Sequence, residues 1–430
     1  MTKVHFMGIA GSGASAAAEI AKSQGFEVSG CDLSLEGHSS KHLNSHMSSG
    51  NVDILAITPA VLSFDPNNPE VAEAKKIGIP VMTWQAFTGK YLLKDKFVIA
   101  VTGTHGKSTT TAMIAKVLEE ANLDPTVLLG AILPEWKTNY RFGKSKYFII
   151  EADEAYDNFL NYKPDISVIT NIEMDHPEYF KDLHAVKESF KKFLLQTKKT
   201  IIANISDPNI ADVLKVVMKT SSGQTSDDRQ LFINYLDYSK NEINFPLKIP
   251  GEFNKLNTKA AFQVGLLLGI DTAIIRKSLS NFTGVGRRFE RLGNYKGREV
   301  YSDFGHHPTE VKATMQAARE KFPNQYIWLI FQPHMFSRTK GLFKEFAEVF
   351  KNLPVNQALI LDIYPSREVD TGLVSSQELV DAVNDNKVDY ISGVEELKEI
   401  LNKEIRPGDI IFFMGAGDID KIARDLLSSA

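Results

Sequence analysis

The sequence predicts an α/β fold of three domains in series, and two features of the chain predict it. Its 430 residues are enough for about three domains at roughly 150 residues each. Short apolar strands also alternate with helical segments, and this alternation starts afresh near residues 96 and 286. Such alternation is typical of parallel sheets covered by helices. Each of the three stretches is therefore expected to form its own sheet.

The first domain is expected to span residues 1–95. Residues 3–9 form a short apolar strand, and the alanine-rich segment 14–25 is expected to be a helix that ends at a glycine. Two further strands are expected at 26–32 and 52–58. A strand, a glycine turn and a helix followed by more strands predict a small Rossmann-like domain.

The central domain is expected to span residues 96–285. It begins with a strand at 97–103, continues through a glycine-rich loop into a long helix, and has later strands at 147–154 and 166–176. These strands lead directly into polar residues, which places the polar residues at the carboxyl edge of a parallel sheet. The order of strand, loop and helix predicts a P-loop ATPase-like parallel-sheet domain.

The C-terminal domain is expected to span residues 286–430. Its strands are expected at 299–307, 326–334, 357–364 and 410–417. The same alternation of strands and helices predicts a second Rossmann-like domain.

Composition and charge narrow the class of protein. The formal net charge of −4 gives no global electrostatic reason to expect nucleic acid or an anionic membrane as a partner. Cys31 is the only cysteine and cannot form an internal disulfide, which fits a reducing compartment. Glycines interrupt residues 1–13 too early for a signal peptide, and no apolar run approaches the ~20 residues of a membrane span. We therefore expect a cytoplasmic enzyme that binds neither nucleic acid nor a membrane.

The first glycine motif, 8-GIAGSGAS-15, lies between the first strand and the first helix. Its glycines let backbone amides approach a diphosphate at the start of the helix, where the helix dipole favours anions. Asp32, about 20 residues further on, is placed to bind a ribose hydroxyl. Taken alone, the motif favours a nicotinamide dinucleotide, and the alternative is a turn that only packs tightly.

A second motif, 103-GTHGKST-109, is a stronger signal for a nucleotide triphosphate. Backbone amides from Gly103 to Lys107 would surround phosphate, the Lys107 ammonium would contact the β and γ phosphates, and the Ser108 hydroxyl would bind Mg²⁺. The standard P-loop pattern is not complete, because its first glycine would fall at Val101.

Residues downstream of this loop support a metal site. Glu151 ends one buried strand, and Asp175 and His176 follow another at the same expected sheet edge. Carboxylate oxygens are typical ligands of hard divalent cations, and histidine also binds metals. We expect Glu151 and His176 to be ligands; the alternative for His176 is a core histidine with satisfied hydrogen bonds.

The third domain contributes basic residues close to its strands. They are His306, His307, His334 and Arg338. Together they suggest a surface turned towards the phosphates, although each segment alone would also fit a solvated loop. Arg287 and Arg288 could neutralise charge that develops on a transferred phosphoryl group. A solvated hinge is the alternative for these two arginines.

Taken together, these motifs resemble those of the Mur ligase family, the ATP-dependent amide-forming enzymes of peptidoglycan precursor synthesis. The resemblance runs through all three domains and is greatest for the alanine-adding branch. It is carried by GIAGSG with VSGCD, TGTHGKSTTTAM, EADE, TNIEMDH, GRRFERLG, DFGHHPTE, FQPHMFSRT, DIYPSRE and GDIIFFMGAGDI.

The resemblance implies a reaction and its substrates. ATP would phosphorylate the lactyl carboxylate of UDP-N-acetylmuramate, and the amine of L-alanine would then attack the acyl phosphate. ATP and Mg²⁺ would be required, and the enzyme would act as a monomer or homodimer. The first domain would bind the UDP-sugar, the second ATP and the third the amino acid.

The resemblance also implies roles for individual residues. Those expected to bind the UDP-sugar are Gly8, Gly11, Ser12, Gly13, Asp32 and His46. Those expected to bind ATP are Gly103, Thr104, His105, Gly106, Lys107, Ser108, Thr109, Asn254, Asn257, Arg288 and Asp303. The expected metal ligands are Ser108, Glu151 and His176. The expected catalytic residues are Lys107, His306 and Arg287, and the expected amino-acid ligands are His307, His334 and Arg338.

Four positions or segments at which this chain differs from family patterns refine the expected function. Sister ligases carry a carbamylated lysine where this chain has Phe190, which fits the alanine-adding branch and its relative, the murein tripeptide recycling ligase. Met335 and Phe336 replace an arginine and a tyrosine, so one charge expected near the amino-acid carboxylate is missing. Phe253 replaces a histidine of the adenine motif, and segment 33–51 is shorter than usual.

Three other functions stay open at this point. The recycling ligase would join UDP-N-acetylmuramate to a tripeptide, but it usually shows F-A-H-H-P-T-A where this chain has FGHHPTE. An NAD-dependent oxidoreductase would explain the first glycine motif but not the P-loop with its trailing carboxylates. A noncatalytic nucleotide-binding module would not need Lys107, Glu151 and His176.

Overall fold

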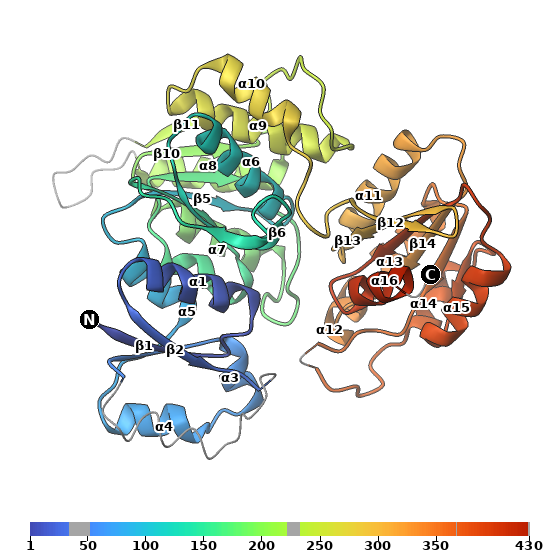
Figure 1. The fold of residues 1–430 in the computed structure, drawn as a ribbon, viewed down its shortest axis with the longest axis horizontal. Helices are drawn as coiled ribbons and strands as arrows, with labels where there is room; N and C mark the ends of the chain where they lie inside the picture. Colours follow the sequence, from blue (N-terminus) through green and yellow to red (C-terminus); the bar gives the residue numbers. More distant parts are fainter. Residues whose placement is uncertain (34–51, 222–232, 367, 429–430) are drawn as a thin grey trace. The chain divides into compact units, whose positions relative to one another are not determined.

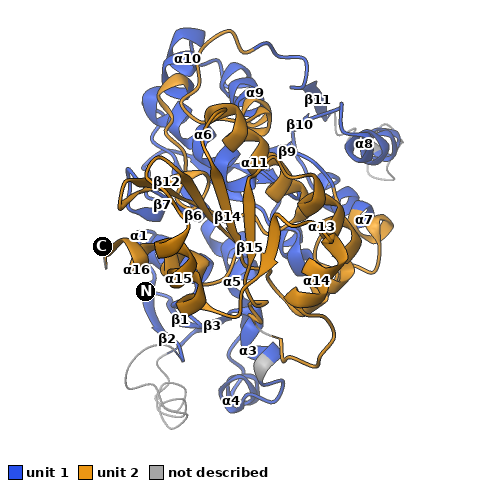
Figure 2. Ribbon diagram, turned by 90° about the vertical axis from the view of Figure 1, so that its right-hand side faces the viewer, with its two compact units in different colours: residues 1–172, 187–242, 258–279 blue, residues 173–186, 243–257, 280–430 orange. Residues whose placement is uncertain are grey.

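The computed structural model describes residues 1–33, 52–221, 233–366 and 368–428. The chain forms two compact units (Figure 2). The first consists of residues 1–172, 187–242 and 258–279, and the second of residues 173–186, 243–257 and 280–430. Within the described residues, the strands form three sheets (Figure 1).

The first sheet is parallel, with strand order β2-β1-β3-β4. Its strands are β1 (Lys3–Met7), β2 (Glu27–Cys31), β3 (Ile54–Ile57) and β4 (Val81–Thr83). Its helices are α1 (Ser12–Ser23), α3 (Pro59–Phe64), α4 (Pro69–Lys76) and α5 (Trp84–Phe87), followed by the π-helix η1 (Thr88–Leu92). All alanines of α1 are buried, because small side chains let a helix pack closely against its neighbours.

The second sheet has strand order β11-β10-β9-β5-β8-β6-β7 and belongs to the first unit. Its strands are β5 (Phe97–Thr102), β6 (Thr126–Leu133), β7 (Thr138–Arg141), β8 (Tyr147–Glu151), β9 (Ile166–Ile169), β10 (Thr200–Ala203) and β11 (Asn234–Asp237). The helices in this stretch of chain are α6 (Lys107–Glu120), the 3₁₀-helix η2 (Ala155–Asn161), α7 (Leu183–Leu194), α8 (Pro208–Ser221), α9 (Glu252–Leu267) and α10 (Thr272–Asn281). The central strands β5, β8 and β9 are almost entirely buried, as continuous apolar runs require.

The third sheet has strand order β12-β13-β17-β14-β15-β16 and belongs to the second unit. Its strands are β12 (Glu290–Tyr295), β13 (Arg298–Asp303), β14 (Ile327–Phe331), β15 (Gln357–Ile360), β16 (Val388–Tyr390) and β17 (Ile410–Met414). Its helices are α11 (Pro308–Lys321), α12 (Phe336–Gly341), α13 (Phe343–Asn352), α14 (Ser376–Val383), α15 (Val394–Lys403) and α16 (Ile419–Ser428). Apolar side chains from α11, α13 and α14 form one core, and those from α15 and α16 form another. The sheet is therefore covered on both faces.

The prediction of an α/β fold with three domains in series is confirmed. The sheets differ from the prediction at two edges, since β7 pairs antiparallel with β6 and β12 pairs antiparallel with β13. Both edge strands are rich in polar residues, so no apolar run reveals them in the sequence. The domain boundaries after residues 95 and 285 remain predictions. Across the described residues, no helix has the length and apolar character that crossing a membrane requires.

Candidate nucleotide and substrate site

The P-loop connects β5 to α6 in the first unit. Gly103 and Gly106 have φ values of +127° and +82°, a region that residues with a side chain rarely adopt. A side chain at position 103 would also overlap the Thr170 hydroxyl. Helix α6 begins at Lys107, and its N-cap residue, Gly106, provides no side-chain cap. The first amides of the helix are therefore suited to an anion.

Residues that follow β9 hold the P-loop in shape. The His105 amide donates to Asn171 Oδ1 at 2.8 Å, and Asn171 Nδ2 donates back to the His105 carbonyl at 3.0 Å. The Thr170 hydroxyl donates to the same carbonyl at 2.6 Å. These three hydrogen bonds fix the loop to the segment after a neighbouring strand, so the loop conformation depends on the pairing of β5 with β9.

Lys107 is held among oxygen atoms. Its Nζ donates to the carbonyls of Gly103 at 2.8 Å and Thr104 at 3.1 Å, and it lies 2.9 Å from Glu154 Oε2 and 3.4 Å from Asp153 Oδ1. Burial lowers the pKa of Lys107, but the charges of Glu154 and Asp153 outweigh it, and the pKa lies above its ordinary value. The ammonium therefore stays charged and suits a phosphate oxygen.

Glu151, the last residue of β8, forms the acidic part of the site. The Ser108 hydroxyl donates to Glu151 Oε1 at 2.9 Å, and the Gly130 amide donates to Glu151 Oε2 at 2.7 Å. Burial raises the pKa of Glu151, against the opposing effects of these hydrogen bonds and of Lys107. Two adjoining oxygen donors in a buried setting fit Mg²⁺, which prefers hard ligands. The predicted ligands Ser108 and Glu151 are thus brought together.

The first glycine turn lies between β1 and α1. Gly8 has φ of +84°, and Ala10 N donates to Asp32 Oδ2 at 3.0 Å. The Asp32 carboxylate therefore braces the turn. A side chain at Gly13 would overlap the ring of Trp84, so this glycine is also required for packing. The predicted ligand His46 lies outside the described residues.

In the second unit, a buried ion pair joins the segment after β9 to helix α12. Arg338 Nε donates to Asp175 Oδ1 at 3.0 Å, and Arg338 Nη1 lies 3.2 Å from His334 Nδ1. Burial would raise the pKa of Asp175, but Arg338 and the neighbouring histidines hold it well below its ordinary range. Met335 is also buried, and its Sδ lies 4.0 Å from Arg338 Nη1. Arg338 thus already has a carboxylate partner.

His176 belongs to the second unit, whereas Ser108 and Glu151 belong to the first. Its backbone has φ of +54°, and its Nδ1 lies 3.1 Å from Glu178 Oε1. Burial would raise the pKa of Glu178, but the hydrogen bond and charge of His176 lower it to about 2. The predicted role of His176 as a metal ligand therefore remains a prediction.

The two adjoining histidines before α11 differ. His307 is the N-cap of α11: its Nδ1 accepts from Thr309 N at 3.2 Å, and its Nε2 faces the Met174 carbonyl at 3.1 Å. Both ring nitrogens are therefore occupied within the protein. His306 Nδ1 lies 3.2 Å from the Phe304 carbonyl, so Nδ1 carries the proton and Nε2 keeps its lone pair. Burial, and then Arg338, lower the pKa of His306 to about 3.

Asp303, at the end of β13, is a buried carboxylate. Its oxygens accept from Phe289 N at 2.9 Å and Gly305 N at 2.7 Å. Burial raises the pKa of Asp303 to about 6. Arg288 Nη1 contacts Glu310 Oε1 at 3.1 Å in the same region.

Arg287 is bound to the loop after β17. Its Nη2 donates to the carbonyls of Gly415 at 2.8 Å and Gly417 at 3.2 Å, and its guanidinium lies 4.8 Å from the centre of the Phe304 ring. These contacts give Arg287 a structural role in holding the loop after β17. Its expected catalytic role remains a prediction.

Asn254 and Asn257 lie on the first turns of α9 and are buried. Asn254 Nδ2 donates to the Pro250 carbonyl at 2.7 Å, and Asn257 Nδ2 donates to Asn254 Oδ1 at 3.3 Å. Phe253, which stands where the family motif has a histidine, packs against the core of the second unit. The structure thus brings the two asparagines together, as their spacing suggests.

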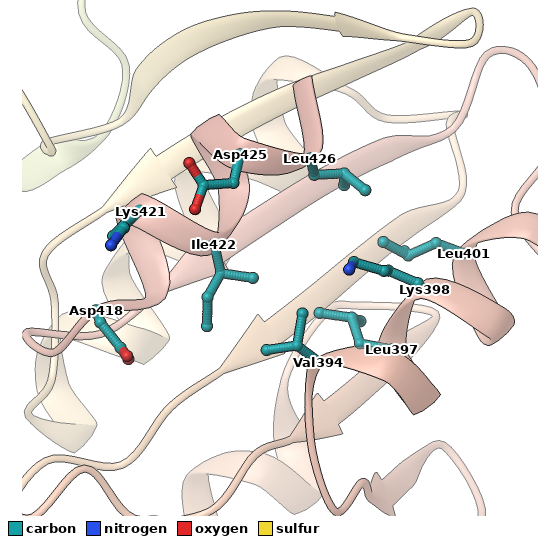
Figure 3. Close-up of a pocket in the computed structure, with 9 residues that line it drawn as sticks. All are labelled: Val394, Leu397, Lys398, Leu401, Asp418, Lys421, Ile422, Asp425 and Leu426. Carbon is teal, nitrogen blue, oxygen red and sulfur yellow. The ribbon is translucent and has the colours of Figure 1, made fainter. Parts of the chain in front are cut away.

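Several residues of the site were not singled out by the sequence. Asp153 and Glu154 belong to the EADE motif and Asn171 to the TNIEMDH motif, so these motifs contain a signal for them. Gly130 lies in no motif, and its contact with Glu151 depends on the pairing of β6. A surface pocket of about 290 Å³ between α15 and α16 has an apolar floor and charged rim residues, including Lys398, Lys421 and Asp425 (Figure 3). No predicted site residue lines it.

Comparison with known proteins defines the family. Family models match three consecutive parts of the chain: "Mur ligase family, catalytic domain" at residues 3–95, "Mur ligase middle domain" at 101–265 and "Mur ligase, glutamate ligase domain" at 287–417. The chain therefore belongs to the Mur ligase family, and it is an ATP-dependent ligase. This confirms the family expected from the motifs.

The relatives include alanine-adding enzymes. The UDP-N-acetylmuramate–L-alanine ligase of Alkaliphilus metalliredigens is 38% identical over 451 residues, covering 99% of this chain and 97% of the relative. The enzyme of the same name from Clostridium tetani is 39% identical over 445 residues, covering 97% of this chain and 96% of that relative. The crystal structure of the UDP-N-acetylmuramate-alanine ligase from Thermotoga maritima gives a TM-score of 0.74 at 25% identity, covering 100% of this chain and 99% of that chain. The resemblance to the alanine-adding branch is confirmed.

Proposed function

We propose that this chain joins L-alanine to UDP-N-acetylmuramate at the expense of ATP, giving UDP-N-acetylmuramoyl-L-alanine, ADP and phosphate. The observation that carries the proposal is the cluster of Lys107, Ser108 and Glu151 around the P-loop. The chain also matches alanine-adding relatives over nearly its whole length, and this match supports the choice of substrates. The reaction would proceed through an acyl phosphate on the lactyl carboxylate.

The residues of the first unit would perform the phosphoryl transfer. The P-loop amides and Lys107 would bind the terminal phosphates, with phosphate taking the place of Glu154 beside the ammonium. Because the Lys107 side chain is only 12% exposed and is charged, it would stabilise negative charge that develops on the transferred group. The amides that begin α1, at Ser12 and Gly13, would bind the UDP diphosphate. Those of Gly8 and Gly11 donate to the carbonyls of Cys31 and Gly8 and hold the turn in shape.

Mg²⁺ fits the oxygen donors of Ser108 and Glu151, with His176 as the further expected ligand. Bound Mg²⁺ would neutralise charge on the phosphates. Partial burial raises the pKa of the Glu151 carboxylate, and a nearby cation would favour its charged form.

The second unit would receive the amino acid. Arg338 and His334 would meet its carboxylate, and His306 Nε2 would accept a hydrogen bond from the attacking amine. His307 has both ring nitrogens occupied, so its expected contact with the amino acid would be through the backbone or through displacement of one of these bonds. The amino-acid preference depends on how Arg338 is shared with Asp175.

We further propose the division of tasks expected from the sequence. Residues 1–95 would bind the UDP-sugar, residues 96–285 ATP and residues 286–430 the amino acid. The enzyme would work in the cytoplasm as a monomer or homodimer, and sedimentation would distinguish these two states.

Phosphate release tests the function. Purified protein with ATP, Mg²⁺ and UDP-N-acetylmuramate should release phosphate at a high rate only when L-alanine is added. Mass spectrometry should find the alanyl product. Release that requires a tripeptide in place of L-alanine would indicate the recycling activity, and binding of NAD with none of the UDP-sugar would contradict both ligase assignments.

A further inference from the structure

Asn139 connects the two sheets of the first unit, and the proposed chemistry does not use it. Its Nδ2 donates to the Ser12 carbonyl at 2.8 Å and to the Leu129 carbonyl at 3.1 Å. Ser12 begins α1 directly after the first glycine turn, and Leu129 lies on β6. The Asn139 side chain is buried. One amide group therefore joins the turn expected to bind the UDP-sugar to the sheet that carries the P-loop.

The irregular pairing of β6 and β7 explains why a side chain is needed here. Leu128 pairs with Tyr140 and Leu133 pairs with Thr138, so residues 129–132 lie opposite Asn139 alone. Such a bulge removes regular backbone hydrogen bonds from the ladder. The Asn139 side chain supplies a donor to the Leu129 carbonyl, which the bulge has taken out of register.

The bulge also contacts Glu151, the acidic residue of the site. Gly130, the next residue, donates its amide to Glu151 Oε2 at 2.7 Å, while Ser108 donates to the other oxygen at 2.9 Å. A side chain at position 130 would come within 2.8 Å of Glu151 Oε1. The backbone of the bulge therefore sets the orientation of the Glu151 carboxylate, and Asn139 holds that backbone at Leu129.

We propose that Asn139 is a positioning residue that aligns the UDP-sugar with the reacting phosphate. The inference rests on the proposed function. One side chain fixes both the start of α1, beside the glycine turn, and the strand that orients Glu151. In transfer reactions a misplacement of about 1 Å can lower the rate by about 10²-fold. Loss of the two hydrogen bonds should therefore reduce turnover much more than it reduces the affinity for either ligand.

The test compares Asn139→Leu, which keeps a similar volume without donors, with Asn139→Ala and with the conservative Asn139→Gln. The matched control is Asn352→Leu, since Asn352 Nδ2 also donates to a backbone carbonyl, that of Glu348 at 2.9 Å, but at the exposed end of α13. Four quantities are measured: kcat by phosphate release, Tm, and by calorimetry the separate Kd values for UDP-N-acetylmuramate and a nonhydrolysable ATP analogue.

We expect kcat of Asn139→Leu to fall by about 30-fold or more while both Kd values change by less than about threefold, with partial recovery in Asn139→Gln and no change in Asn352→Leu. Two results would overturn the proposal: a lower Tm with parental kcat, which indicates a purely structural role, or a weaker Kd for UDP-N-acetylmuramate with parental kcat, which indicates a local contact. If Asn139→Ala does not fold, Asn139→Leu decides. A parent protein that releases no phosphate with both substrates would refute the proposed function, whereas parental kcat in Asn139→Leu would refute only the role of Asn139.

Discussion

Two glycine turns of the first unit occupy equivalent places, each between a parallel strand and a helix, but they are built differently. The turn after β1 is braced by Asp32 through Ala10 N, and α1 has no acidic residue in its first turn. The loop after β5 is braced by Asn171 and leads into Lys107, whose ammonium is held beside Glu154 and Asp153. The first turn leads to the amides at the start of α1, whereas the second adds a fixed cation. In the proposed reaction, the first turn would therefore bind a phosphate without changing it, whereas the second would promote phosphoryl transfer.

Removing the cation should abolish this difference and produce the largest effect. Lys107→Ala is expected to lower kcat by about 10³-fold, since a preorganised donor to the transferred charge is lost. Glu154 also loses its ammonium partner, so we expect the free energy of unfolding to fall by about 3 kcal/mol. Steady-state kinetics and urea unfolding measure the two effects.

The double variant Lys107→Ala with Glu154→Gln provides the control. It should regain most of the lost stability, because the buried charge is removed, but none of the activity. Near-parental ligation by a folded Lys107→Ala protein would contradict the assignment of the P-loop.

Replacing Glu151 should change the site at the P-loop and leave the first glycine turn unaffected. Glu151→Gln is expected to raise the Mg²⁺ concentration for half-maximal rate by about tenfold or more, because a neutral amide is a weaker ligand for a hard cation. A magnesium titration of phosphate release measures it, and His176→Ala should shift the same curve if His176 is a ligand. Curves that overlay that of the parent would exclude the tested residue as a ligand.

Removing Asp32, which braces the first turn, should weaken binding at that turn and leave the P-loop unaffected. Asp32→Ala is expected to weaken the Kd for UDP-N-acetylmuramate by about tenfold, because the carboxylate expected to bind a ribose hydroxyl is lost and a hydrogen bond to a charged group contributes about 1.5–3 kcal/mol. Asp32→Asn keeps an acceptor for Ala10 N and should restore much of the affinity. Calorimetry with the ATP analogue should show no change, and a change there would mean that Asp32 also acts on the P-loop.

The smallest effect concerns the amino acid. From the sequence alone, Met335→Arg should lower the KM for L-alanine by restoring a missing charge, but Met335 is buried beside Arg338. A second guanidinium there would repel the first, so we now expect the KM to rise by about threefold, a difference of about 0.7 kcal/mol. Met335→Leu is the uncharged control and should leave the KM unchanged. A lower KM for Met335→Arg would show that the new arginine reaches the carboxylate.

The sequence predicts what apolar runs and local motifs encode. Strands β5, β8 and β9 are continuous apolar runs, and the P-loop follows β5 directly. The three strands and the loop could therefore be predicted from the sequence. Contacts between distant segments could not be found in this way. The contact of Gly130 with Glu151 depends on the bulge in β6, and the pairing of Arg338 with Asp175 depends on how the second unit folds.

The sequence around His307 also contains a helix-capping signal. Its position before Pro308 and three residues before Glu310 is that of a helix N-cap with a capping box. Its place near other basic residues instead favours a binding surface and an amino-acid ligand. Local helix chemistry explains its contact with Thr309 N, whereas its contact with the Met174 carbonyl depends on how the second unit folds.

The contacts of Lys107 have an entropic consequence. A free lysine side chain has about 2 kcal/mol of rotamer entropy to lose when it is fixed. Here the carbonyls of Gly103 and Thr104 and the carboxylate of Glu154 already confine the ammonium. That loss therefore accompanies folding of the chain, and an arriving triphosphate meets a cation whose position needs little further ordering.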